Sequence, residues 1–145
     1  MSSWENTKIQ IRLLNIEINR QVDAPAWIVW DILTDTFIWP YWGPSVTGVD
    51  HCGRHIGAGS KGRVKTIFGK WAPFEIIEFE NGRYWSWKVF GIQATGHRIE
   101  DLGDDRCNLV FEIPLLAGPY TVVCSIAANR IATIAEKRVR SGIHS

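Results

Sequence analysis

The chain has 145 residues, of which 46% are hydrophobic and 21% charged, and this composition is typical of a globular protein rather than a disordered one. Its length favours a single domain over residues 1–145. A formal net charge of +1, with lysines and arginines scattered along the chain, gives no electrostatic reason to expect a nucleic-acid partner.

The first predicted element is a strand in the alternating segment from Leu14 to Ile18, and we expect residues 1–11 before it to be loose. A helix is predicted to begin at Pro25, whose fixed φ suits a first turn, with Asp23 as a candidate N-cap. Asp35 is predicted to cap a second short helix, which Pro40 together with Gly43-Pro44 is predicted to end. The first helix is expected to bury most of its circumference, because apolar residues recur at helical spacing at Trp27, Ile28, Trp30 and Leu33.

Six further strands are predicted after these helices. Asn81-Gly82 is the strongest hairpin signal and predicts a type I′ turn, and Gly103-Asp104-Asp105 predicts another tight turn. Consecutive strands joined by tight turns indicate an antiparallel meander. The predicted strands cover residues 45–52, 62–68, 73–80, 83–90, 93–101 and 106–113.

A long helix is predicted from Tyr120 to about Arg140. Its apolar stripe needs an apolar surface to cover, and a curved sheet is the one available. The expected class is therefore α+β, with a curved antiparallel sheet of seven strands wrapped around a C-terminal helix in the order β-αα-β6-α. The stripe consists of Tyr120, Val123, Cys124, Ala127, Ile131, Ile134 and Ala135.

Several motifs together resemble those of the START/SRPBCC superfamily of helix-grip proteins. They include Ala24-Pro25, Trp39-Pro40-Tyr41-Trp42 and Gly118-Pro119 at the start of the last helix. Residues 94–105, ATGHRIEDLGDD, resemble the polyketide cyclase/dehydrase-like branch. The resemblance implies a helix-grip fold with a ligand cavity between the sheet and the C-terminal helix.

Strand alternation suggests which side chains face such a cavity. If Ile99 points inward, Thr95 and His97 share its face, while Arg98 and Glu100 face solvent. His97 is either an acid–base group or a buried histidine satisfied by hydrogen bonds. Arg63 either holds a carboxylate or carbonyl of a ligand or is exposed. The candidate ligand-binding residues are Arg63, Phe74, Trp85, Trp87, Thr95, His97, Phe111, Tyr120, Cys124 and Ala127.

Other candidate sites have ordinary interpretations. Trp39 and Trp42 form a ligand-stacking wall, touch a membrane, or close the end of the barrel, and the last role is the most ordinary one. No regular ligand spacing surrounds His51, Cys52 and His55, so we expect no metal. The sequence has no GxxxxGK(S/T) motif and no GxGxxG motif between a strand and a helix, so we expect no nucleotide cofactor. The other two cysteines, Cys107 and Cys124, are far apart, and all three are expected to be small buried side chains.

The favoured function is binding of a hydrophobic or amphipathic small molecule, such as a lipid, a polyketide or an aromatic metabolite. A polyketide aromatase/cyclase or dehydratase with His97 as the acid–base residue is the alternative, and a protein-interaction module with a filled cavity is the second alternative. We expect no stable membrane insertion, because no apolar run is long enough. The N-terminus lacks the apolar region of a secretion signal, which predicts a cytoplasmic protein. The sequence gives no indication of the oligomeric state.

Overall fold

The computed structural model describes residues 15–114 and 120–142. Seven strands form one antiparallel sheet in the order β1-β7-β6-β5-β4-β3-β2, which confirms the predicted helix-grip architecture. The strands are β1 (Asn15–Val22), β2 (Val46–His51), β3 (Lys61–Thr66), β4 (Trp71–Glu80), β5 (Tyr84–Val89), β6 (Ile92–Gly103) and β7 (Arg106–Pro114). The helices are α2 (Ala26–Thr34), α3 (Trp39–Trp42) and α4 (Thr121–Arg140).

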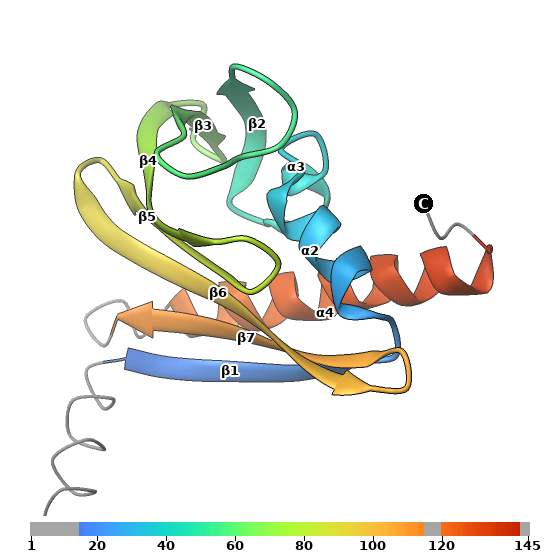
Figure 1. The fold of residues 1–145 in the computed structure, drawn as a ribbon. Helices are drawn as coiled ribbons and strands as arrows, with labels where there is room; N and C mark the ends of the chain where they lie inside the picture. The colour runs from blue at the N-terminus through green and yellow to red at the C-terminus, as the bar shows by residue number, and fades with distance from the viewer. Residues whose placement is uncertain (1–14, 115–119, 143–145) are drawn as a thin grey trace, which may run out of the picture.

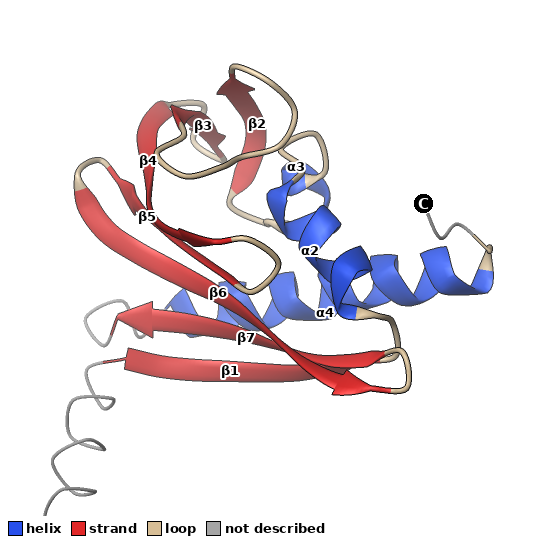
Figure 2. Cartoon of the chain, in the orientation of Figure 1, coloured by secondary structure: helices blue, strands red, loops and turns tan. Residues whose placement is uncertain are grey.

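The sheet is strongly bent, and α4 runs along its concave side (Figure 1). The helix packs on β1 and β7 and also contacts α2 and α3. Register shifts at Ile76/Glu78 and Ser86/Lys88 interrupt the pairing of the middle strands. Such irregularities increase the local bend of a sheet. They lie where β4 and β5 turn away from the flatter layer of β1, β6 and β7 (Figure 2).

Small side chains let α4 approach the sheet closely. The residues that the helix buries most completely are mainly alanines, and a helix surface without bulky side chains lies close to its neighbours. The half-buried Ile134 and the partly exposed Tyr120 lie at the margins of the predicted stripe. The buried residues of the helix are Cys124, Ala127, Ala128, Ile131, Ala132 and Ala135. No described helix is long and apolar enough to cross a membrane.

The predicted helix caps were wrong. Pro25 is the N-cap of α2 rather than its first helical residue, and no side chain, including that of Asp23, caps this helix. The N-cap of α3 is Ile38 rather than the predicted Asp35, because residues 36–38 form a turn between the two helices. The carboxylate of Asp35 instead accepts a hydrogen bond from the backbone N–H of Phe37 at 3.0 Å within that turn.

Two burial predictions also failed. Trp27 is 50% exposed, so α2 buries less of its circumference than its apolar content indicated. Cys52 is exposed, whereas the other two cysteines are buried, and all three are free thiols. The predicted loose segment, residues 1–11, lies outside the described residues, as does Gly118-Pro119.

Turns with positive φ at both central residues, as type I′ requires, occur at positions other than the predicted one. Only Gly82 has a positive φ in the Asn81-Gly82 turn, whereas a type I′ turn needs positive φ at both central residues. Asp104 and Asp105, with φ of 53° and 57°, meet that requirement between β6 and β7. Phe90 and Gly91, with φ of 56° and 72°, meet it between β5 and β6.

Candidate ligand-binding cavity

A cavity of about 570 Å³ lies between the concave side of the sheet and the N-terminal half of α4. Strands β2, β3, β5, β6 and β7, helix α3 and the loops after α3, β3 and β5 supply the rest of its wall. Of the ten predicted ligand-binding residues, the structure places seven on this wall: Trp87, Thr95, His97, Phe111, Tyr120, Cys124 and Ala127.

The other three predicted residues do not line the cavity. Arg63 is exposed and pairs with Asp50, its Nη2 lying 2.7 Å from Oδ2, and its guanidinium lies over the ring of Trp71. The inward side chain of β3 is that of the neighbouring Val64. Phe74 and Trp85 do face inward, but they are covered by other aromatic rings and belong to the core.

An aromatic cluster fills part of the space between the sheet and the helices. Trp39 stacks on Trp85 with ring centroids 5.5 Å apart and an interplanar angle of 12°, and it contacts Trp87 edge-on at the same separation. The Trp39 indole N–H donates to the carbonyl oxygen of Leu33 at 2.9 Å, which fixes α3 against α2. Trp39 and Trp42 are both buried and both form part of the cavity wall.

Hydrogen bonds hold His97 in one tautomer. Its Nδ1 lies 3.2 Å from the carbonyl oxygen of Trp85, and because a carbonyl only accepts, Nδ1 must carry the proton. Nε2 then accepts from the hydroxyl of Thr95 at 3.0 Å, and that hydroxyl accepts from the indole N–H of Trp87 at 3.0 Å. Both ring nitrogens are thus occupied, and His97 is only 2% exposed.

The titratable groups on the wall are held in their neutral forms. Burial lowers the pKa of His97 to about 3, so the imidazole stays uncharged at neutral pH. Burial also raises the pKa of the Cys124 thiol to about 12 and raises the pKa of Tyr120, whose hydroxyl is hydrogen-bonded to Ser45. Among the described residues that line the cavity, none has a charged side chain. The wall is therefore apolar and electrically neutral.

A cavity of this size cannot be an empty void. At the rate measured for sealed engineered cavities, keeping 570 Å³ empty would cost about 14 kcal/mol, but this cavity is open at its mouth, so water or a ligand can enter. The space therefore holds water or an apolar molecule. Water has few partners on this wall, because Thr95 and His97 already bond to each other and to neighbouring groups.

Sequence reasoning missed the residues at the mouth of the cavity. Ile67 and Phe68 come from the turn after β3, Phe90 comes from the turn between β5 and β6, and Ile92 is the first residue of β6. The predicted strands 62–68 and 83–90 included Ile67, Phe68 and Phe90, whereas β3 ends at Thr66 and β5 ends at Val89. Strand alternation therefore gave no correct indication of where these side chains lie.

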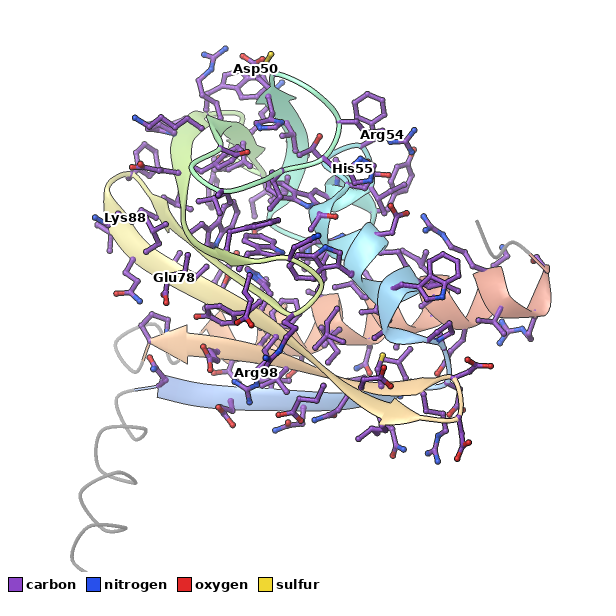
Figure 3. All side chains as sticks on the ribbon, viewed as in Figure 1. Asp50, Arg54, His55, Glu78, Lys88 and Arg98 are labelled. Carbon is purple, nitrogen blue, oxygen red and sulfur yellow. The ribbon has the colours of Figure 1, made fainter. Side chains whose placement is uncertain are left out.

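A second hollow, beside α2, contains a network of ion pairs. Asp35 is almost fully buried and accepts from Nε of Arg54 at 2.9 and 3.0 Å. Asp31 accepts from His55 Nε2 at 2.9 Å and from Arg138 Nη1 at 3.0 Å. Figure 3 shows Arg54 and His55 together near α3. Although Asp31, Asp35 and His55 lie close enough to share a cation, their oxygens and nitrogens already bind one another and the two arginines.

Residues 14–140 match the model of the family described as polyketide cyclase / dehydrase and lipid transport. The chain belongs to this family. A comparison with curated proteins finds no match.

Several solved structures share the fold. The Zhui aromatase/cyclase from Streptomyces sp. R1128 matches with a TM-score of 0.69 and 17% identity, over 88% of this chain and 96% of that one. A conserved protein of unknown function from Enterococcus faecalis matches with a TM-score of 0.66 and 15% identity, over 84% and 71% of the two chains. At these identities the likeness shows the fold alone.

Proposed function

We propose that the protein binds an uncharged, largely apolar small molecule in the cavity between the sheet and α4. A lipid, a polyketide or an aromatic metabolite has the required chemistry. The observation that carries the proposal is the wall itself: none of its described residues is an acid, a lysine or an arginine, and burial keeps its one histidine, His97, uncharged. A charged group inside this wall would lose its hydration without gaining a counter-ion. If the ligand is amphipathic, its charged end therefore stays in water at the mouth.

Apolar burial would supply most of the affinity. A ligand that buries about 300 Å² of apolar surface gains about 7 kcal/mol before the costs of association are subtracted. The hydroxyl of Thr66 and the amide of Gln93 lie on the wall and can orient a hydroxyl or carbonyl group of the ligand.

The cyclase or dehydratase alternative has less support from this cavity. It requires His97 to exchange a proton near neutral pH, whereas burial lowers the pKa of His97 to about 3 and both ring nitrogens are engaged. The interaction-module alternative rests on a filled cavity, and a volume of about 570 Å³ does not favour it. Binding without chemistry is the function that this geometry supports best.

Titration with Nile red, an uncharged fluorescent apolar dye, tests the proposal. We expect saturable binding that Ala127→Phe weakens at least tenfold, because the added ring enters the cavity. Ala58→Phe is the matched control, since Ala58 is exposed on a loop away from the cavity. Thermal denaturation followed by circular dichroism verifies that both variants fold. Absence of saturable dye binding, or an equal affinity in the two variants, contradicts the proposal.

A competition experiment tests the charge preference. Dodecanol and dodecanoate have similar chains, but only the second is charged at neutral pH. We expect dodecanol to displace Nile red at a lower concentration than dodecanoate does. Equal or better displacement by the carboxylate would show that the neutral wall does not select the ligand.

A further inference from the structure

Four apolar side chains surround the mouth of the cavity and project into solvent. They are Ile67, Phe68, Phe90 and Ile92, which are 58%, 84%, 60% and 71% exposed, and we call them the apolar rim. They lie at the tips of two hairpins, β3–β4 and β5–β6, on the same side of the molecule (Figure 1). Exposed apolar side chains that gather in one patch mark interaction sites.

The backbone at Phe90 is strained. Its φ of 56° lies in the left-handed region, which costs a non-glycine residue about 1–2 kcal/mol. A type I′ turn favours Asn, Asp or Gly at this position, and a phenylalanine there gains nothing from burial because its ring is exposed. An exposed ring on a strained turn suits a residue that contacts a partner.

The charges around the apolar rim are positive. Lys65 and Lys70 flank one pair of rim residues, Lys88 lies two residues before Phe90, and all three lysines are exposed. Figure 3 shows Lys88 near the β5–β6 turn. The sequence contains no acidic residue from 61 to 74 or from 81 to 99. The nearest acid on these strands is Glu75, which pairs in register with Lys88.

We propose that the apolar rim docks on an anionic lipid bilayer, with the mouth of the cavity facing the lipid. Apolar tips flanked by lysines are the arrangement that binds at the boundary between acyl chains and anionic headgroups. A protein partner would need a broad complementary surface, whereas the apolar rim consists of four side chains on two narrow tips. Docking goes beyond the proposed function, because it does not depend on which ligand fills the cavity. It would let an apolar ligand pass between bilayer and cavity without crossing water.

Flotation with vesicles tests the apolar part of this proposal. Vesicles of phosphatidylcholine with phosphatidylserine are compared with vesicles of phosphatidylcholine alone. We expect the protein to float with the first kind and the double variant Phe68→Ser/Phe90→Asn to lose at least tenfold in affinity. Leu102→Ser is the matched control, because Leu102 is 51% exposed at the opposite end of β6. Asn is favourable at the φ of residue 90, so the double variant should fold.

A charge series tests the electrostatic part. Two double variants are compared, and each removes two positive charges. The first is Lys65→Gln/Lys70→Gln beside the apolar rim, and the second is Lys137→Gln/Arg140→Gln at the far end of α4. We expect the first pair to weaken vesicle binding about 25-fold and the second to have little effect.

Failure of the unaltered protein to float with anionic vesicles would overturn the proposal and favour a protein partner. Equal flotation of the rim double variant and its control would overturn it too. Nile red titration without vesicles reports on the cavity independently, so failure of docking is distinguishable from failure of ligand binding.

Discussion

The hydroxyl of Thr95 donates to Nε2 of His97 across 3.0 Å, and this bond makes the imidazole a fixed part of the wall rather than a free acid–base group. The bond connects Trp87, Thr95, His97 and the Trp85 carbonyl in one chain of donors and acceptors. Every polar atom of this chain has a partner, so removing one member leaves others unsatisfied. Outside this chain, the indole N–H of Trp85 is the one buried side-chain polar group among the described residues that has no hydrogen-bond partner.

Thr95→Val is expected to lower the free energy of unfolding by about 1–3 kcal/mol, because it leaves His97 Nε2 and the Trp87 N–H without a partner. Thr95→Ser retains the hydroxyl and serves as the control. We expect it to lower the free energy of unfolding by less than Thr95→Val does. Urea denaturation of both variants measures the difference. Equal losses would mean that the hydroxyl contributes nothing beyond its packing.

The stability of the protein should fall as the pH drops below the pKa of an ordinary histidine. Because the pKa of His97 is lowered to about 3, the unfolded chain binds a proton below about pH 6.5 while the folded chain does not. Stability is therefore fully present above pH 6.5 and is lost towards pH 3, at up to about 1.4 kcal/mol per pH unit from this residue. Urea denaturation from pH 7 to pH 4 measures this slope. The free energy of unfolding of His97→Gln should depend less steeply on pH. An identical dependence in the variant and the unaltered protein would show that His97 does not cause it.

Ala127 and Ala128 are adjacent and both buried, but only Ala127 lines the cavity. Ala127→Leu is expected to change the free energy of unfolding by less than about 1 kcal/mol, because the added carbons enter open space. Ala128→Leu should destabilise by about 1–3 kcal/mol, because it overpacks the core. Thermal denaturation compares the two variants directly. A similar loss in both would indicate that the space beside Ala127 is not open.

Phe90→Asn is expected to stabilise the fold by about 0.5–1 kcal/mol, because Asn tolerates the left-handed region better than Phe does. The exposed Phe90 ring loses little packing when it is removed. Leu102→Asn, an exposed position on the same strand as Ile92 but without positive φ, should give no such gain. Destabilisation by Phe90→Asn would show that the ring makes a stabilising contact after all.

Local periodicity in the sequence determined the fold. Alternating strands, tight turns and the apolar stripe of α4 are properties of neighbouring residues, so they can be read without knowledge of the tertiary structure. The same alternation placed Thr95, His97 and Phe111 on the inward face. For Arg63 the sequence left two roles open, and the structure has it exposed and paired with Asp50, while the neighbouring Val64 faces inward.

Only the tertiary structure decided which inward residues meet open space. Phe74 and Trp85 face the same interior as Trp87, but Trp39 covers Trp85 through a contact between segments 46 residues apart in the chain. The neutral state of His97 likewise requires the Trp85 carbonyl and complete burial, neither of which periodicity predicts. The apolar rim forms because the β3–β4 and β5–β6 hairpins are alternate turns of the antiparallel meander and lie at the same end of the sheet. Periodicity specifies which face a side chain takes, whereas the curvature of the sheet and the packing of distant rings decide what that face contacts.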